Sequence, residues 1–396
     1  MNQNNNTSRK YNLIIIIPLL LITVFFFIAF FVYPKQAKSE SENRYLAPFP
    51  EISKQNMKSL PVSLEKYYND HFPFRENFME LYSNIELSQG KIKVRDLYIL
   101  DDFILPIEYL YSKNDIALSA EKTNELMDFI SSHGKKIGYV ALPYKTYIYN
   151  YMLPAYLQTD YSVQNYNNYI EKLQPDIKTC DAFYAYKDHN IEDIESYFFK
   201  SDFHWNAKGA GEAFVYIIDW LINENLIDEH NTSTLVSNLD GFDYIYIDDN
   251  YIGDLNRRYS FIFSTDELIP VFNNEESLIR YYSNYNSDEY SLDKGSIQGE
   301  PLPEGQTYDS VYTKNIGYYK MVNDDSLLDT KILIIKDSMQ NPMTDMFFHV
   351  FNTSEVVDIR GLTDISLYTI IENSDADLVL LMYHQNNVTG EMFNFK

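Results

Sequence analysis

An unbroken apolar run near the N-terminus limits what this chain can fold into. The segment LIIIIPLLLITVFFFIAFFVY spans Leu13 to Tyr33, and as a helix it is long enough to cross a hydrocarbon core about 30 Å thick. A cleaved signal peptide carries a shorter apolar region, about 7–15 residues, followed by a small-x-small cleavage site. The sequence after the run, YPKQAKSESE, offers only a poor site of that kind. We therefore predict an uncleaved transmembrane anchor at residues 13–33.

The charges that flank the run bear on its orientation. Arg9 and Lys10 precede it, and Lys35 and Lys38 follow it, so the positive-inside rule is close to a tie. The short polar N-terminus and the acidic residues beyond the anchor favour a cytoplasmic N-terminus. We expect a single-pass protein of the cell membrane, with residues 1–12 in the cytoplasm and the main domain outside it.

The composition excludes several classes of function. The chain has 396 residues and a formal net charge of -25, whereas nucleic-acid binding depends on clustered Lys and Arg side chains that neutralise phosphates. We therefore expect no nucleic-acid partner. Cys180 is the only cysteine, which rules out an intrachain disulfide and a cysteine-based metal cluster. The histidines include no pair with the H-x-x-x-H spacing of a zinc site, so we expect no metal and no cofactor.

The rest of the chain reads as an arm followed by one main domain. Prolines at 48, 50 and 61 block long helices in residues 34–75, which we predict as an extended arm. In residues 76–396, short apolar runs suited to buried parallel strands alternate with helical segments. The strand candidates are 137–142, 331–336, 354–359 and 377–383, and the helical segments are 119–132, 207–223, 339–351 and 363–374. This alternation predicts an α/β sandwich with a parallel sheet.

Residues 240–330 interrupt this alternation. They are rich in Tyr, Asn and Asp and include GEPLPEG, and we interpret them as an insertion of loops and short strands that walls a cleft. The stretch YYSNYNSDEYS, residues 281–291, is the candidate for contact with a glycan. The 36 Tyr and 25 Phe of the chain favour core and strand packing in general, and a groove that stacks on sugars stays open as an alternative.

Ser338 stands at a turn between a strand and a helix. The sequence KILIIKDSMQNPMTDMFFHVF, which begins at Lys331, reads as strand, polar turn and helix. In an open α/β sheet, ligands bind beyond the carboxyl ends of the strands, and N–H groups at the start of a helix can stabilise an anion there. Ser338 is therefore either a nucleophile or a cap of the following helix.

Asp202 and His204 are candidates for activating such a serine. A serine hydroxyl needs a base to accept its proton, usually a histidine that a carboxylate orients. The sequence KSDFHWNAKGAGEAF, from Lys200, supplies both groups. In the alternative, Asp202 solvates a loop and His204 fills a gap. Trp205 and Asn206 favour the first interpretation, because a buried indole and a helix cap hold the imidazole at a defined point.

A series of motifs resembles one protein family. SDFHWNAKGAGEAF (201–214) is similar to the signature of the DHHW proteins, which belong with the permuted SGNH-hydrolase-like proteins that include the alginate O-acetyltransferases. The other motifs that resemble this family are ENRYLAPFP (42–50), NDHFPFRENF (69–78), LPYKTYIYNYMLP (142–154), YIGDLNRR (251–258), LIIKDSMQNPM (333–343) and VVDIRG (356–361). They follow the order of the family and cover most of the chain.

The resemblance implies roles for individual residues. In that family the signature Asp and His act with a later Ser, which corresponds to Asp202, His204 and Ser338, an order reversed relative to ordinary SGNH esterases. In place of the family's GxND block the chain has MYHQNN (382–387). The oxyanion donor candidates are Ser338, Tyr383, Asn386 and Asn387. The substrate-binding candidates are Trp205, Lys145, Arg257 and Arg360.

Two residues depart from the family pattern. Phe203 replaces the first His of the family name, and we expect this to be tolerated because alternation along the chain directs its side chain away from the catalytic face. Lys336 stands where other members have Gly in GDS. This second change shifts the expected oxyanion stabilisation toward the N–H of Ser338 itself.

The resemblance also implies a fold and a function. We expect an SGNH-hydrolase-like domain that acts as a serine-dependent O-acetyltransferase or O-acetylesterase on a cell-surface polysaccharide or wall polymer, through an acyl-serine intermediate. A multi-spanning membrane O-acyltransferase is the implied partner that delivers the acetyl group. The alternative is a non-catalytic glycan-binding or assembly protein that retains the fold.

Overall fold

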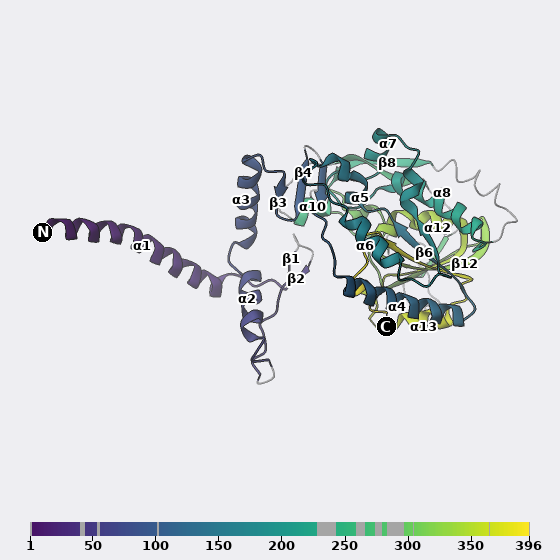
Figure 1. Ribbon diagram of the computed structural model, residues 1–396, viewed down its shortest axis with the longest axis horizontal. Helices are drawn as coiled ribbons and strands as arrows, with labels where there is room; N and C mark the ends of the chain where they lie inside the picture. The colour runs from purple at the N-terminus through teal and green to yellow at the C-terminus, as the bar shows by residue number, and fades with distance from the viewer. Residues whose placement is uncertain are drawn as a thin grey trace. The chain divides into compact units, whose positions relative to one another are not determined.

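The computed structural model divides the chain into two compact units. It describes residues 2–39, 44–53, 56–100, 103–227, 243–258, 266–273, 279–282, 297–303, 305–363 and 365–395. The first unit comprises residues 1–91 with 257–261, and the second comprises residues 92–256 and 262–396 (Figure 1). Residues 283–291 of the predicted glycan-contacting stretch lie outside the described residues.

The first unit is mainly helical. Its elements are α1 (Asn2–Val32), β1 (Lys38–Ser39), β2 (Arg44–Tyr45), α2 (Leu60–Asp70) and α3 (Arg75–Ser88). The predicted arm is thus extended only in part, because α2 forms within it. Pro61 does not prevent this helix, since it stands in the first turn, where backbone N–H groups have no helical acceptor.

Helix α1 contains the whole apolar run except Tyr33. In its second half, the Phe26 ring packs against Phe72 and Phe78, with centroids 5.3 and 5.8 Å apart. Other large side chains of α1 are exposed, among them Leu19 and Phe27. Among the residues with a described structure, no helix is both long and apolar enough to cross a membrane.

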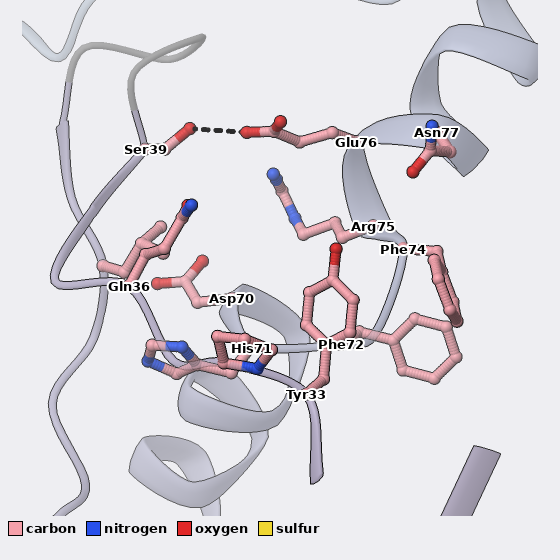
Figure 2. Close-up of a pocket in the computed structure, with 12 residues that line it drawn as sticks. Tyr33, Gln36, Ser39, Asp70, His71, Phe72, Phe74, Arg75, Glu76 and Asn77 are labelled. Atoms are coloured by element: carbon pink, nitrogen blue, oxygen red, sulfur yellow. Dashed lines mark hydrogen bonds between the residues drawn. The ribbon is translucent and has the colours of Figure 1, made fainter. Parts of the chain in front are cut away.

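A small pocket of about 100 Å³ lies within the first unit (Figure 2). Asp70 accepts a hydrogen bond from the Ala47 N–H at 2.8 Å, and the His71 Nε2 lies 2.9 Å from the Ala47 carbonyl oxygen. The Ser39 hydroxyl donates to Glu76 at 3.5 Å. These polar groups therefore connect Ala47 to the end of α2 and Ser39 of β1 to the start of α3.

The second unit is built on a seven-stranded mixed sheet. In spatial order its strands are β10 (Ile279–Tyr282), β11 (Tyr318–Asn323), β13 (Phe351–Val357), β12 (Leu328–Lys336), β14 (Leu378–His384), β6 (Lys136–Leu142) and β7 (Lys178–Asp181). Strands β13 to β7 are parallel, as the sequence predicts. Strand β11 pairs antiparallel with both of its neighbours, β10 and β13, which corrects the expectation of a parallel sheet throughout.

The connection after β11 explains its direction. Only residues 324–327 separate β11 from β12, and a parallel crossover needs about a dozen residues or more. The chain therefore reverses, and β11 pairs with β13 in the antiparallel sense. Residues from the predicted insertion thus add two strands to the main sheet.

Helices cover both faces of this sheet and form two hydrophobic cores. Residues of β12 alternate between them: Ile334 joins the core of α8 (Ala207–Asn223) and α12 (Thr344–Val350), and Leu333 joins the core of α4 (Lys113–Ser132), α6 (Tyr161–Ile170) and α13 (Leu367–Asn373). The predicted α/β sandwich is confirmed. The predicted helix 339–351 is divided into the 3-10 helix η5 (Ser338–Met343) and α12.

The remaining elements of the second unit are short. They are β3 (Lys93–Val94), β4 (Leu97–Leu100), β5 (Phe103–Pro106), α5 (Lys145–Tyr149), η1 (Asn150–Met152), η2 (Ala182–Tyr186), α7 (Ile191–Glu195), β8 (Tyr244–Tyr251), β9 (Asp266–Phe272), α11 (Tyr308–Val311), η6 (Ile359–Gly361) and η7 (Glu391–Phe393). Helix α10 (Asp254–Arg258) crosses the division between the units.

Candidate active site

Ser338 lies directly beyond the carboxyl end of strand β12. This strand is flanked by the parallel strands β13 and β14, so Ser338 stands at the edge where such sheets bind ligands. Its neighbours Asp337 and Met339 are buried, whereas Ser338 is partly exposed. The turn therefore presents one hydroxyl group and covers the residues on either side.

Asp202, His204 and Ser338 form a continuous chain of hydrogen bonds. The His204 Nδ1 lies 2.8 Å from the Asp202 Oδ1, and the His204 Nε2 lies 2.9 Å from the Ser338 Oγ. With Asp202 accepting from Nδ1–H, the Nε2 is left to accept from the serine hydroxyl. The structure thus brings together the three residues that the sequence singles out, in a geometry that can move the serine proton to His204.

The second oxygen of Asp202 is also satisfied. It accepts from the Tyr251 hydroxyl at 2.8 Å and from the Asp254 N–H at 2.9 Å. Burial by itself would raise the pKa of this carboxyl, but the charge and hydrogen bond of His204, with the Asp254 N–H and Tyr251 hydroxyl, hold the pKa well below its usual range. Asp202 is therefore an ionised, fixed acceptor for His204.

Aromatic rings lie against the imidazole of His204. The Tyr308 ring is stacked on it, with centroids 3.8 Å apart, and the Phe203 centroid is 3.9 Å away. The expectation that Phe203 points away from the site is wrong. Residues 201–204 form turns and bends instead of a strand, so side-chain alternation does not apply to them.

Trp205 and Asn206 fix the segment that follows the imidazole. Trp205 is fully buried, and its Nε1–H donates to the Met339 carbonyl oxygen at 2.6 Å. The Asn206 side chain caps α8, as predicted, because its Oδ1 accepts from the N–H groups of Lys208 and Gly209. The indole therefore connects the loop of His204 to the turn of Ser338.

Lys145 holds the loop that carries Asp202. Its side chain is fully buried, and its ammonium group donates to the carbonyl oxygens of Phe199, Lys200 and Asp202 at 2.6, 2.9 and 2.7 Å. The sequence predicts a substrate-binding role for this residue. The contacts instead indicate that Lys145 fixes the backbone of the loop.

The oxyanion candidates occupy different environments. Among the described residues, no acceptor is bonded to the Ser338 N–H, so this group is available to an oxyanion. Tyr383 is buried and donates to the Met392 carbonyl oxygen at 2.8 Å, which directs it into the core. The Asn387 amide donates to Asp337 at 3.1 Å. The Asn386 Oδ1 is buried, with no hydrogen-bond partner in the described part of the chain.

Asp337 is a site residue that the sequence reasoning missed. Its Oδ1 accepts from the Met339 N–H at 3.0 Å, and its Oδ2 accepts from the His384 N–H at 2.8 Å as well as from the amide of Asn387. The carboxylate therefore ties the turn of Ser338 to the end of β14. The only signal in the sequence is its position immediately before the serine.

The two arginine candidates lie on different elements, Arg360 on η6 and Arg257 on α10. The Arg360 Nε and Nη2 donate to the two oxygens of Asp358 at 2.9 and 2.6 Å, beyond the carboxyl end of β13. Arg257 lies on α10, whose first residue, Asp254, donates to Asp202. Their roles in substrate binding stay predictions. Within the described residues, no group of three or more His, Cys, Asp or Glu side chains is placed to hold a metal ion.

Comparisons with known proteins agree with this architecture. Residues 101–239 match the family model described as SGNH hydrolase-like domain, acetyltransferase AlgX. PatB1 of Bacillus cereus, solved with a sulfonyl adduct, is 19% identical, with a TM-score of 0.65 over 77% of this chain and 99% of that chain. A DHHW family protein from Eubacterium siraeum is also 19% identical, with a TM-score of 0.56 over 76% of this chain and 95% of that one.

At these identities the structures show a shared fold. Among curated proteins, none matches the sequence significantly. The resemblance inferred from the sequence is therefore confirmed: residues 101–239 match the model of an SGNH hydrolase-like domain of the acetyltransferase AlgX type, and the chain shares its fold with a DHHW family protein.

Proposed function

We propose that this protein is a serine-dependent O-acetyltransferase or O-acetylesterase that works through an acyl-serine intermediate. The observation that carries the proposal is the hydrogen-bonded chain from Asp202 through His204 to Ser338, at 2.8 and 2.9 Å. A non-catalytic protein would have no need to keep a buried carboxylate, an imidazole and a partly exposed serine in this register. The match to an acetyltransferase family model supports acetyl as the transferred group.

The proposed reaction has two halves. His204 Nε2 accepts the Ser338 proton as Oγ attacks the carbonyl carbon of an acetyl donor. The carbonyl oxygen becomes an oxyanion that accepts from the Ser338 N–H. The bond from carbon to the leaving oxygen then breaks, that oxygen takes the proton from His204, and an acetyl-serine remains. In the second half, His204 deprotonates a sugar hydroxyl or water, whose oxygen attacks the acetyl carbon. The bond from that carbon to Ser338 Oγ then breaks, Oγ takes the proton back from His204, and an acetylated sugar or acetate leaves.

The proposed substrate is a cell-surface polysaccharide or wall polymer. The net charge of -25 disfavours polyanionic partners, since like charges repel, and suits a neutral or weakly charged glycan. Transfer and hydrolysis use the same residues, and they differ in whether a sugar hydroxyl or water reaches the acetyl-serine. A multi-spanning membrane O-acyltransferase is the proposed source of the acetyl group.

We also propose that the apolar run at residues 13–33 anchors the protein and that the second unit lies outside the cytoplasmic membrane. The support is the length of the run together with the exposure of apolar side chains such as Leu19 and Phe27. Protease added to spheroplasts should digest the second unit while a cytoplasmic marker stays intact. Protection of the second unit until the membrane is dissolved would contradict this topology.

The catalytic proposal is tested by trapping the intermediate. Purified protein is mixed with p-nitrophenyl acetate, quenched early and digested, and the peptide that contains Ser338 is examined by mass spectrometry. We expect an acetyl adduct on Ser338 and its disappearance when a glycan acceptor is added. The Ser338→Ala protein is the matched control, and it should fold normally and release no p-nitrophenol above background. Equal turnover by the folded Ser338→Ala protein would rule out the proposed chemistry.

A further inference from the structure

Lys336 is a fully buried lysine two residues before the nucleophile. It is the last residue of β12, and its side chain has no solvent exposure. A buried ammonium group costs free energy unless it is paired and hydrogen-bonded. The contacts that compensate for this cost show which parts of the molecule the lysine connects.

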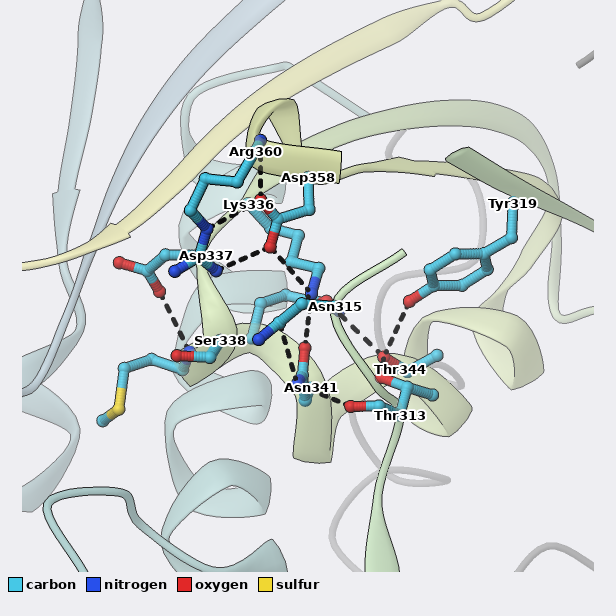
Figure 3. Close-up of polar contacts among 12 residues, drawn as sticks. Thr313, Asn315, Tyr319, Lys336, Asp337, Ser338, Asn341, Thr344, Asp358 and Arg360 are labelled. Atoms are coloured by element: carbon cyan, nitrogen blue, oxygen red, sulfur yellow. Dashed lines mark hydrogen bonds and ion pairs between the residues drawn. The ribbon is translucent and has the colours of Figure 1, made fainter. Parts of the chain in front are cut away.

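The ammonium group of Lys336 has three polar neighbours (Figure 3). It donates to the Asn341 Oδ1 at 2.6 Å and to the Asn315 Oδ1 at 3.0 Å. The Asp358 Oδ2 lies 3.7 Å away and balances its charge. Asp358 is itself held by both hydrogen bonds from Arg360.

These contacts enclose the turn that carries Ser338. Asn341 belongs to η5, whose first residue is Ser338, so the bond from Lys336 to Asn341 spans the serine. The Asn341 amide donates in turn to the Thr313 carbonyl oxygen at 2.6 Å. The turn is thereby tied to the segment before β11, in addition to the bond with Asn315.

We propose that Lys336 is a positioning residue that holds Ser338 in register with His204 by clamping η5 through Asn341. This inference rests on the proposed function, because it assumes that Ser338 is the nucleophile. It also gives a reason for a lysine where the family pattern has glycine: the side chain is buried, and among the described residues no acceptor is bonded to the Ser338 N–H. A misplacement of about 1 Å at a reacting group can lower a rate about 100-fold.

The lowered pKa of Lys336 allows its contact with Asn341 to be tested by varying the pH. Burial lowers its pKa from the ordinary 10.5 to about 8; Arg360 adds to this shift, while Asp358, Asp337 and Asp309 oppose it. The ammonium group therefore loses its proton in a range that kinetic measurements reach. A neutral amine has one donor fewer and no charge for Asp358, so the clamp should loosen above about pH 8.

The experiment measures how fast Ser338 reacts with phenylmethanesulfonyl fluoride in the full-length protein. Ser338 Oγ forms the bond to sulfur, fluoride leaves, and His204 takes the proton. Mass spectrometry of the intact protein follows the adduct over time. For Lys336→Met we expect a rate about 10- to 100-fold lower than the parent, with kcat on p-nitrophenyl acetate reduced similarly and KM little changed.

Two further variants separate positioning from general stability. Lys135 donates to the carbonyl oxygens of Ser374 and Ala376, so Lys135→Met removes a lysine clamp elsewhere and should leave the sulfonylation rate at the parent value. Asn341→Leu removes the acceptor and keeps Lys336. It should slow the reaction as much as Lys336→Met does, and the double variant should be no slower than either single variant.

The outcomes distinguish this inference from the proposed function. In the parent, the rate should fall on the alkaline side with an apparent pKa near 8, and this decline should be absent from Lys336→Met. Parent rates and an unchanged pH profile in folded Lys336→Met and Asn341→Leu proteins would overturn the positioning role alone. Equal labelling of the parent and of Ser338→Ala would overturn the proposed function instead.

Discussion

The Tyr308 ring lies parallel to the His204 imidazole, with centroids 3.8 Å apart and an interplanar angle of 12°. Its hydroxyl also donates to the Ser338 carbonyl oxygen at 3.1 Å. The first residue of α11, which lies between β10 and β11, therefore contacts the imidazole of His204 and the backbone of Ser338 together.

We expect the ring of Tyr308 to matter more than its hydroxyl. An aromatic pair contributes about 0.5–1.5 kcal/mol beyond burial, and about 1.4 kcal/mol corresponds to a tenfold change in rate. Tyr308→Leu should therefore lower kcat on p-nitrophenyl acetate roughly 3- to 10-fold, whereas Tyr308→Phe should stay close to the parent. Steady-state kinetics of both variants, normalised to folded protein by circular dichroism, test this order, and the reverse order would contradict it.

Asp202→Asn should remove most activity. The carboxylate fixes the tautomer of His204 through the 2.8 Å bond, and loss of such a group in a comparable triad lowers kcat about 10⁴-fold. Normal rates in the folded variant would show that His204 does not need Asp202.

The depressed pKa of Asp202 also has a consequence for stability. Its carboxylate stabilises the folded state fully above about pH 4, the value for Asp in an unfolded chain, and this contribution is lost as the pH falls toward the lower pKa of the folded protein. The free energies of unfolding in urea of the parent and of Asp202→Asn should therefore differ by a constant amount between about pH 5 and pH 7. This difference in free energy should become smaller below about pH 4. A difference that becomes larger there would contradict the lowered pKa of Asp202.

Gly253→Ala should disturb the backbone that donates a hydrogen bond to Asp202. A Cβ atom at this position would lie 2.0 Å from the Ser201 carbonyl oxygen, so the backbone must shift, and with it the Asp254 N–H that bonds Asp202. We expect a loss of about 1–3 kcal/mol in the free energy of unfolding and a lower kcat. Ser201→Ala removes only the 3.2 Å bond to the Gly253 N–H and should have a smaller effect on both quantities.

Lys145→Met should destabilise the protein and reduce its activity. The substitution removes the Lys145 donor from the buried carbonyl oxygens of Phe199 and Asp202, whereas the Lys200 carbonyl oxygen keeps its bond from the Ile104 N–H. One such unsatisfied group costs about 1–3 kcal/mol. We expect a loss of at least about 2 kcal/mol in urea unfolding, with lower kcat because the loop of Asp202 moves. An increase in KM alone, at parent stability, would favour the substrate-binding role predicted from the sequence.

The sequence predicts the parts of the site that local pattern determines. Strand β12, the turn at Ser338 and the cap by Asn206 follow from short apolar runs and from polar residues at their ends, and all three are present. The convergence of Asp202 and His204 on Ser338 follows from the family resemblance, because no local signal links residues 134 positions apart.

Contacts between distant segments could not be predicted in this way. Tyr251 and Tyr308 are two among 36 tyrosines, and only the fold of residues 240–330 brings them to Asp202 and His204. Lys336 gave no sign of its partners, because Asn315 and Asn341 become its neighbours only when η5 packs beside the segment before β11. Likewise, the antiparallel direction of β11 depends on the length of its connection to β12, in a part of the sequence with no regular period.

Strand β14 follows Asp202, His204 and Ser338 along the chain, yet it lies between β12 and β6 in the sheet. Its last residue also supplies the N–H that holds Asp337 beside the nucleophile. During synthesis, a chain that has emerged only as far as β13 therefore contains every residue of the triad but lacks the strand that joins its two halves. We therefore expect Ser338 to become reactive only after β14 is made, and we expect products of interrupted translation to be inert toward esters although they contain all three residues.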